Sequence, residues 1–517
     1  MTMRPAHRLC FLILALTVAC AACALQTTTP VKPAPDDGKP QGAIGERPIE
    51  QAYGAPRLAV GQEGQVYLLW LAMGWQEGQR SSDVLFARSA DGGATWSQPP
   101  TSLKPAKATI VGGPQIATGP KGQVYVVWRE WRPKIKRAPL HFVRSQDYGK
   151  QWDAPPRVVS VSDDAGFPQL LTDQEGGVHV ASLVGPKSRR VLDVMSSHDF
   201  GGTFPSTPTR LTAAFPASEH GITNHRFAAD EEGRLYVVWE EAVRRGTDSR
   251  IYLRRSLDRG KTWAGPVLVS TPEEGEHRAL TPQVVTTQNG RVYVAWAQDE
   301  FRADPEGKPD EVKFPDRFIY INRSLDHGQT WLPRPIRLSL VDQSPLVAAT
   351  PQLSLDRRGH IYATWIEGDR SFPKRLLFAR SSDAGLVWTD PKVRLERVRL
   401  DLTSPFGGQP AHPMIRSDDS GHIWIVWQEI NPDQKQWQLL VNRSDDGGVT
   451  WRARATPLVS VTSRGGGYRG VSFEDDAHGR LYVAWEGGRE DAQAIYLNRS
   501  IDFGETWLSP EVEIGRR

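Results

Sequence analysis

The chain has 517 residues, of which 39% are hydrophobic, and it is rich in Gly, Pro and Trp, proportions typical of a turn-rich all-β protein. Its 63 Lys and Arg nearly balance 60 Asp and Glu, and the net charge of +3 gives no reason to expect nucleic acid or an anionic membrane surface as a partner. All three cysteines, Cys10, Cys20 and Cys23, lie near the N-terminus, which excludes disulfides, thiolate metal sites and a cysteine nucleophile from the rest of the chain.

The first 23 residues have the features of an export signal. Basic residues precede an apolar run from Leu9 to Leu16, which is too short to span a membrane permanently. The sequence from Leu16 to Cys20 resembles a bacterial lipobox, and Cys23 follows two alanines as a second candidate. We expect residues 1–23 to be a signal peptide that ends in a lipidated cysteine, Cys20 or failing it Cys23, with an ordinary cleaved signal as the alternative.

Residues 24–47 contain Thr, Pro, Lys, Asp and Gly with almost no apolar side chains, which is the composition of a flexible tether. Together with the signal, this segment predicts an exported protein that faces the periplasm or the cell surface and touches a membrane only through its lipid anchor.

An eight-residue segment repeats along the remainder of the chain. It has the pattern Ser-x-Asp-x-Gly-x-Thr-Trp, with small variations, and its eight copies are Ser89–Trp96, Ser145–Trp152, Ser197–Phe204, Ser256–Trp263, Ser324–Trp331, Ser381–Trp388, Ser444–Trp451 and Ser500–Trp507. In such a turn the Asp carboxylate and the Ser and Thr hydroxyls can bond to nearby backbone groups, Gly can supply positive φ, and the Trp can pack between sheets. The regular recurrence of one short segment along the chain indicates a propeller or a repeat array.

A strand-like block of β-branched and aromatic residues precedes the eight-residue segments, as in Gly122–Trp128 and Gly290–Trp296. A shorter strand lies about eight residues before each block, and further strands flank the repeated turn. Each repeat therefore holds four strands, which is one propeller blade.

These repeats resemble the Asp-box (BNR repeat) propellers of the sialidase superfamily, over about residues 48–515. The resemblance implies an all-β fold, a single β-propeller of eight four-stranded blades that occupies residues 48–517, each blade with an Asp-box turn. Non-enzymatic propellers share the box, which lies on the face opposite the sialidase active site. The motif therefore predicts an architecture and leaves the reaction open.

The face opposite the boxes is the predicted binding face, because antiparallel pairing brings the start of each first strand and the end of each second strand there. The residues expected at these positions are Arg57, Gln115, Gln169, Arg226, Gln283, Gln352, Met414 and Ser472, with Glu130, Glu241, Gln298, Glu367 and Glu429. Such amides, carboxylates and arginines suit a polyhydroxylated ligand, and Trp75 and Trp131 could stack on sugar rings. The alternative is that the Gln and Glu side chains satisfy backbone groups between blades.

The sialidase resemblance implies particular catalytic residues. Tyr468 resembles the nucleophile, Glu486 the Glu that follows it and orients an arginine, and Asp83 the acid/base. The alternative for Tyr468 is a ring packed at the mouth of its blade.

The arginine candidates for a substrate carboxylate are Arg57, Arg226, Arg250 and Arg469. Two positions depart from the family pattern: Gly54 stands where the first arginine is expected, and Asn224 to Arg226 stand where a Tyr-activating Glu is expected.

The sequence thus predicts an exported, lipid-anchored, sialidase-like propeller that binds a carbohydrate or glycoconjugate at its top face. It does not predict binding of nucleic acid. Sialidase-type exo-glycosidase activity stays open, and the alternative function is a non-catalytic protein-docking scaffold of the cell envelope. We expect no cofactor, no metal and a monomer.

Overall fold

The computed structural model describes residues 52–76, 79–104, 110–131, 138–160, 164–186, 189–212, 221–244, 248–270, 277–300, 315–339, 347–368, 373–389, 393–396, 413–431, 436–459, 468–476, 478–489 and 492–515. The predicted signal peptide, tether and lipidated cysteine lie outside these residues. Within them the regular elements are β-strands, which confirms the all-β class. No helix of the described residues is long and apolar enough to cross a membrane.

Strand pairing divides the described chain into consecutive groups of four strands. The first four groups are β1 (Ala52–Val60), β2 (Val66–Gln76), β3 (Gln79–Ser89) and β4 (Thr101–Ser102); β5 (Ile110–Thr118), β6 (Val124–Trp131), β7 (Leu140–Ser145) and β8 (Arg157–Val158); β9 (Ala165–Thr172), β10 (Val178–Val184), β11 (Val191–Ser197) and β12 (Thr209–Arg210); β13 (Ile222–Ala229), β14 (Leu235–Arg244), β15 (Asp248–Ser256) and β16 (Val267–Leu268).

The same order continues to the C-terminus. The last four groups are β17 (His277–Thr286), β18 (Val292–Glu300), β19 (Asp316–Ser324) and β20 (Ile336–Arg337); β21 (Val347–Leu355), β22 (Ile361–Gly368), β23 (Pro373–Ser381) and β24 (Val393–Glu396); β25 (Met414–Ser417), β26 (Ile423–Asn431), β27 (Gln436–Ser444) and β28 (Thr456–Pro457); β29 (Arg469–Asp475), β30 (Leu481–Arg489), β31 (Ala492–Ser500) and β32 (Val512–Gly515).

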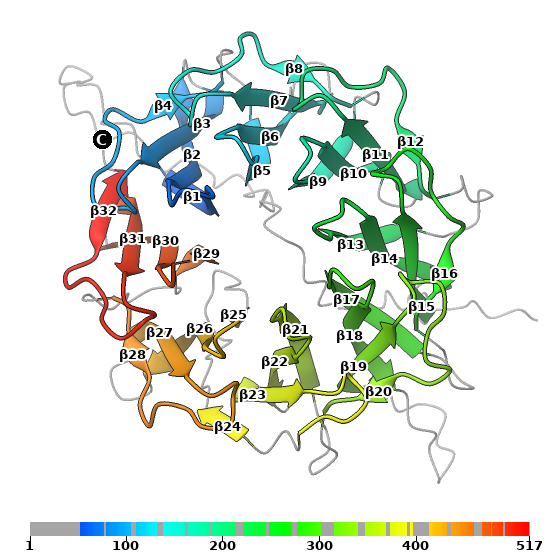
Figure 1. Ribbon diagram of the computed structural model, residues 1–517. Helices are drawn as coiled ribbons and strands as arrows, with labels where there is room; N and C mark the ends of the chain where they lie inside the picture. Colours follow the sequence, from blue (N-terminus) through cyan, green and yellow to red (C-terminus); the bar gives the residue numbers. More distant parts are fainter. Residues whose placement is uncertain are drawn as a thin grey trace, which may run out of the picture.

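The groups are arranged in a ring, with the first strand of each group nearest the axis and the short fourth strand outermost (Figure 1). Within a group the strands are antiparallel. Single parallel bridges, Ser249 to Arg278 and Arg317 to Val347, join three neighbouring groups into one twelve-stranded sheet. This is the arrangement of a propeller-type fold.

The second strand of each group is buried on both faces because a neighbouring group covers each face. In β6, for example, the five residues from Val124 to Trp128 are all buried, which explains why the sequence there reads as a continuous apolar run.

Buried apolar clusters lie between consecutive groups, and one lies between the first group and the last. That cluster joins Leu58 and Trp70 of the first group to Tyr482, Leu497 and Ile514 of the last. The two ends of the described chain are therefore side by side, as Figure 1 shows for β1 and β29.

The repeated eight-residue turns join third and fourth strands and have the hydrogen bonds expected of them. In the fifth group, Ser324 Oγ donates to Asp326 Oδ1 at 2.7 Å and accepts from the Gly328 amide at 2.8 Å, while the Thr330 amide and hydroxyl donate to the two Asp326 oxygens. The turn's aromatic residue packs on the preceding group, as Trp152 does edge-on against Phe86 with ring centroids 4.8 Å apart.

Candidate functional site

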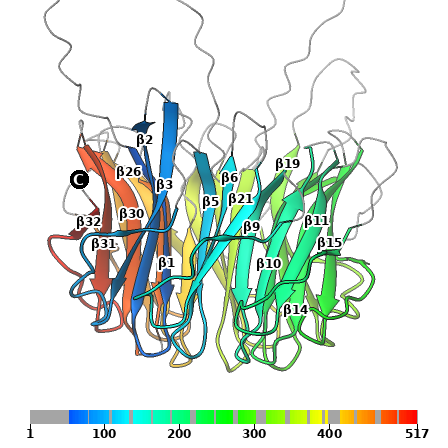
Figure 2. The ribbon, with the colours of Figure 1, turned by 90° about the horizontal axis from the view of Figure 1, so that it is seen from above.

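We call the face with the eight-residue turns the bottom face and the opposite one the top face. Because the strands of a group alternate in direction, each first strand begins, and each second strand ends, at the top face. Figure 2 views the ring from the side, with the strands running between the two faces.

A β-bulge interrupts the first strand near the top face in most groups. The pairing register of β1, β5, β9, β13, β17, β21 and β29 with their second strands shifts at this point. Four bulge residues with side chains have left-handed backbones: Phe167 (φ 53°), Asn224 (φ 46°), Thr281 (φ 51°) and Thr350 (φ 54°). Such a conformation costs roughly 1–3 kcal/mol per residue, so the surrounding structure must impose it.

Glu240 connects two of these bulges. It lies near the top of β14 and is only 8% exposed. Its Oε2 accepts from Asn224 Nδ2 at 2.7 Å in its own group and from the Thr281 amide at 3.2 Å in the next group. Burial raises the pKa of the Glu240 carboxyl, and the hydrogen bonds from Asn224 oppose that effect. The result is a buried carboxyl close to the axis.

Glu241, the predicted ligand-binding residue beside it, faces the other side of β14. Its Oε2 accepts from the indole Nε1 of Trp239 at 2.9 Å. The same indole bond recurs in the next two groups, from Trp296 to Gln298 at 3.0 Å and from Trp365 to Glu367 at 2.8 Å. A carboxylate or amide two residues after the second-strand Trp thus stabilises the interior of its blade.

A charge ladder crosses the top of the fifth group. Asp299 on β18 is fully buried and lies between Arg278 on β17 and Arg317 on β19. The Nε atoms of Arg278 and Arg317 donate to the Asp299 carboxylate at 2.9 and 2.6 Å, and each guanidinium adds a second bond from Nη2. These paired, charge-assisted bonds saturate the carboxylate.

A second basic cluster lies at the seam between the second and third groups. The Arg129 guanidinium lies 5.6 Å from the Trp131 ring centre, donates from Nε to the Ala165 carbonyl at 2.9 Å and places Nη2 3.6 Å from Asp164. The Arg190 guanidinium stacks 5.0 Å above the Phe167 ring. We refer to these five residues as the seam cluster: Arg129, Trp131, Asp164, Phe167 and Arg190.

Asp164 acts on both arginines of the seam cluster. Burial lowers the pKa of Arg129, and Asp164 opposes this. Burial also lowers the pKa of Arg190, with Asp164 opposing and the Arg129 charge adding to the decrease. One carboxylate serves two guanidinium groups.

The predicted nucleophile, Tyr468, and the predicted arginine-orienting carboxylate, Glu486, point to opposite neighbours. The Tyr468 ring is buried edge-on against Trp485, and its hydroxyl donates to the Trp437 carbonyl of the seventh group at 3.1 Å. The Glu486 carboxylate instead faces the first group, where a Cβ on Gly54 would lie 3.3 Å from its Oε2. An arginine at position 54 would therefore crowd Glu486.

Asp83 lies on the third strand of the first group, away from the axis. It accepts from the Val84 amide at 2.7 Å and from Ser102 Oγ on β4 at 2.9 Å. The structure does not bring Asp83 to Tyr468, whose hydroxyl lies against the seventh group.

The predicted arginines are dispersed around the ring. Arg57 and Arg226 each donate from Nη1 to the carbonyl of the preceding residue, at 3.0 and 3.1 Å, on first strands of groups that are not neighbours (Figure 1). Arg250 pairs across strands with Glu241, and its Nη2 lies 3.4 Å from Asp248. The buried Nε of Arg250 has no hydrogen-bond partner among the described residues.

The backbone of Arg469 pairs with Glu486, and Trp75 pairs with Arg80, but the side chains of Arg469 and Trp75 fall outside what the structure describes. Cys20 lies outside the described residues altogether.

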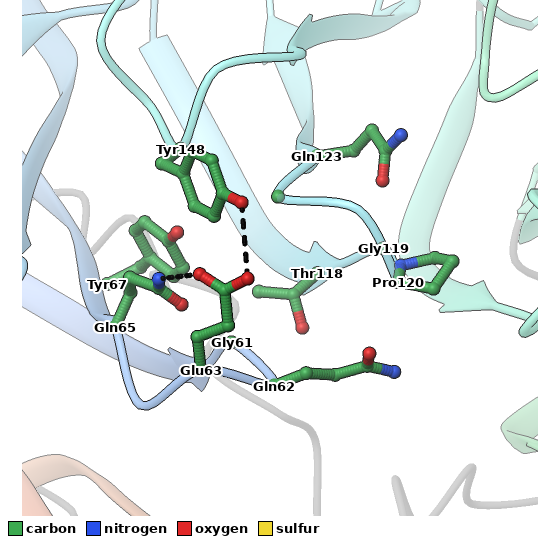
Figure 3. A pocket seen from close by; sticks show the side chains of 11 residues that line it. Gly61, Gln62, Glu63, Gln65, Tyr67, Thr118, Gly119, Pro120, Gln123 and Tyr148 are labelled. Atoms are coloured by element: carbon green, nitrogen blue, oxygen red, sulfur yellow. Dashed lines mark hydrogen bonds between the residues drawn. The ribbon is translucent and has the colours of Figure 1, made fainter.

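A small pocket lies on the bottom face, between the turn after β1 and the turn after β5 (Figure 3). Glu63 is central to it and accepts from Gln65 Nε2 at 3.0 Å and from the Tyr148 hydroxyl at 3.4 Å. Glu63 thus bonds within its own turn and to the eight-residue turn of the second group, and the pocket is remote from the top face. In the part of the chain that the structure describes, no group of three or more His, Cys, Asp or Glu side chains is placed to hold a metal ion.

Fold and site together define an all-β protein of the propeller type with a polar, arginine-containing top face. No family model matches the sequence, and no curated protein matches it.

Solved structures similar to the chain include several carbohydrate-active enzymes. An ulvan lyase of a new polysaccharide lyase family is 16% identical over 75% of this chain and 94% of its own, with a TM-score of 0.49. An α-L-arabinofuranosidase of Fusarium graminearum in complex with arabinobiose is 16% identical over 65% and 93%, with a TM-score of 0.40. The NanB sialidase of Streptococcus pneumoniae is 11% identical over 86% and 91%, with a TM-score of 0.38. Likeness at this level does not extend to a substrate or a reaction for this chain.

Sequence reasoning missed Glu240, Asp299 and the charge ladder, and it identified Asn224 only as a departure from the family pattern. No local signal marks them, because their partners lie on neighbouring strands or groups. The basic residues around Trp131 did give a signal, although the stacking of Arg190 on Phe167 joins positions that are far apart along the chain.

Proposed function

We propose that the chain forms one closed, eight-bladed propeller of the Asp-box type that binds saccharide at its top face. The eight groups of four strands and the apolar cluster shared by the first and last groups support a closed ring. The N-terminal sequence supports export and anchoring of this ring through lipid on Cys20. Intact-mass analysis of membrane-extracted protein tests the anchor, since an unmodified N-terminus would rule it out.

The half-buried Trp131 is the single observation that carries the binding proposal. It stands at the top end of β6, where Arg129 lies over its ring and is itself fixed by the Ala165 carbonyl. An indole ring offers an apolar face to the C–H groups of a sugar, and the adjacent guanidinium offers N–H donors to its hydroxyls. A fixed aromatic with fixed donors beside it is a platform that loses little entropy on binding.

Binding without sialidase-type hydrolysis is the form of this function that the geometry supports best. A tyrosine nucleophile needs a hydroxyl exposed to the sugar and a base within hydrogen-bond reach. The Tyr468 hydroxyl is buried on the Trp437 carbonyl, and Asn224 to Arg226 stand where the Tyr-activating Glu is expected. Asp83, on the third strand, is bonded to Ser102.

The proposal is tested on a glycan array with the purified protein, beside Trp131→Ala and the control Tyr148→Ala. Tyr148 is also a half-buried aromatic, but it lies on the bottom face. We expect array binding that Trp131→Ala weakens about five- to thirtyfold and that Tyr148→Ala leaves unchanged, because loss of a stacking ring costs on the order of 1–2 kcal/mol. A fluorogenic sialoside should show no turnover above background.

Two outcomes would overturn this reading. Turnover that is abolished by Tyr468→Phe would make the protein a sialidase-type glycosidase. An array without binding would favour the protein-docking scaffold of the cell envelope.

A further inference from the structure

The seam cluster differs from the other basic positions of the top face in how its charge is satisfied. In the ladder of the fifth group, two arginines share a fully buried carboxylate through paired short bonds. At the seam, the nearest approach of Arg129 to Asp164 is 3.6 Å, and the Asp164 side chain is 54% exposed. The seam therefore places Arg129 beside a weaker, more solvated counter-charge, and Arg190 stacks on Phe167, two residues after the Ala165 carbonyl that Arg129 bonds.

The two guanidinium groups are nevertheless held in place. Arg129 is fixed by the Ala165 carbonyl and the Trp131 ring, and Arg190 by the face of Phe167. The left-handed backbone of Phe167 (φ 53°) sets that ring at the bulge of β9, which lies next to the axis (Figure 1). Positive charges that are positioned before binding cost little to organise around an incoming anion.

We propose that the seam cluster is a subsite for the anionic group of an acidic saccharide, a carboxylate or a sulfate ester, with Arg129 and Arg190 on the anion and Trp131 against the sugar ring. This inference rests on the proposed saccharide binding and adds the substrate class to it. The planar guanidinium suits an oxyanion because it presents parallel N–H donors. The anion also relieves the repulsion between Arg129 and Arg190.

The position of the subsite separates it from the arginines on the innermost strands. Arg57 and Arg226 lie on first strands, each bonded to its own preceding carbonyl. Arg129 lies on the second strand of one group, and Arg190 precedes the third strand of the next. An extended oligosaccharide that runs from the axis across the seam therefore fits better than a single sugar at the centre.

The test measures the affinity of the purified full-length protein for matched pairs of oligosaccharides by calorimetry. An oligogalacturonate and its methyl ester test a carboxylate, while a sulfated galactan oligosaccharide and its desulfated form test a sulfate ester. The variants are Arg190→Gln, Arg190→Lys and Trp131→Ala. The matched control is Arg189→Gln, because Arg189 is the adjacent, exposed arginine and is not part of the seam cluster. Thermal melting checks that each variant is folded.

We expect tighter binding of at least one acidic oligosaccharide than of its neutral form. Arg190→Gln should weaken binding of the acidic form at least about tenfold and leave the neutral form nearly unchanged. Arg190→Lys should weaken binding of the acidic form less than Arg190→Gln does, because lysine keeps the positive charge and loses only the parallel N–H donors of the guanidinium. Arg189→Gln should change it less than about twofold, and Trp131→Ala should weaken both forms.

The failures are distinguishable. If neutral oligosaccharides bind and depend on Trp131 while acidic ones are not preferred, the subsite is wrong and the proposed function stands. If Arg190→Gln does not change the affinity for the acidic oligosaccharides, the proposed subsite is also wrong. The same holds if duplex DNA competes for binding as well as the acidic oligosaccharides do. If no saccharide binds, both proposals fail.

Discussion

At the scale of single residues, an acid with a raised pKa lies near the bottom of the innermost strands. Burial raises the pKa of Asp475 to about 6; Arg416 opposes this, and the carboxylates of Glu474, Asp476 and Asp418 reinforce it. The Arg416 Nε lies 3.5 Å from Asp475 while its Nη2 is engaged by Glu474 at 2.9 Å. One arginine thus serves several carboxylates, which leaves Asp475 poorly compensated.

This environment predicts a pH-dependent effect of Asp475→Asn. Because the folded-state pKa is above the unfolded value, the native state binds more protons between about pH 4 and pH 6, and Asp475 lowers stability as pH rises through that window. Asp475→Asn should therefore raise the unfolding free energy by about 1–3 kcal/mol at pH 7 and change it little at pH 4. Denaturant unfolding at the two pH values measures this.

The control is Asp419→Asn, which removes one negative charge from an exposed position on the neighbouring turn. It should have a similar effect at both pH values. Equal effects of the two variants across the pH range would show that Asp475 is not the perturbed group.

At the scale of elements, the eight-residue turn is a self-contained unit. In each copy the Ser hydroxyl and the Asp carboxylate bond to backbone groups within four residues, as in Ser89 to Asp91 and Ser500 to Asp502. The turn also contacts the preceding group, where its aromatic residue packs and an arginine donates to its carbonyls, as Arg255 Nη1 does to the Asp326 and His327 carbonyls at 3.1 and 2.8 Å. The turn fixes the connection between third and fourth strands and places the aromatic ring on the preceding blade.

Asp326→Ala should lower the unfolding free energy by about 1–2 kcal/mol, because it leaves the Gln329 and Thr330 amides without their acceptor. Burial alone would raise the pKa of Asp326, but hydrogen bonds from Thr330 and Ser324 outweigh it and lower the pKa to about 2. The contribution of the carboxylate is therefore present above about pH 4 and is lost as pH falls toward 2.

Denaturant unfolding of Asp326→Ala beside Leu325→Ala measures this effect. Leu325 is the exposed neighbour in the same turn, 52% exposed, and should contribute little. Equal losses from the two variants would contradict the role given to the carboxylate.

At the scale of the whole molecule, the interface between the first and last groups resembles the interface between the first and second. Trp70 is fully buried in the former and Trp128 in the latter. Ser472 Oγ also accepts from the Leu58 amide at 3.0 Å across the junction. These contacts support the proposed closed ring.

Trp70→Ala and Trp128→Ala should therefore each cost about 3–5 kcal/mol, because both remove a fully buried indole. Denaturant unfolding compares them under one set of conditions. If Trp70→Ala costs much less, the first and last groups are not held together in solution, and the closed ring would be wrong.

The candidate site could be predicted from the sequence only in part. Trp131 and the arginine beside it were visible as an aromatic within a basic stretch, and the carboxylates after the second-strand tryptophans were visible as a repeated position. Adjacent carboxylates have different roles. Glu241 accepts a hydrogen bond from the Trp239 indole within its own blade, whereas Glu240 accepts one from a backbone amide of the next blade. Which face of a strand a residue takes follows from the alternation of side chains, but which neighbour it meets does not.

The sequence by itself determined the repeat and the strands within it, because these depend on interactions over a few residues: a Ser, an Asp and a Gly close each turn, and apolar runs form the doubly covered second strands. Only the tertiary structure decided the chemistry of the top face. Asp299 meets Arg278 and Arg317 across strands about twenty residues apart. Arg129 bonds the Ala165 carbonyl across a seam between blades, two residues before the Phe167 ring on which Arg190 stacks. Those pairings depend on the relative position of whole sheets, which no local pattern in the chain specifies.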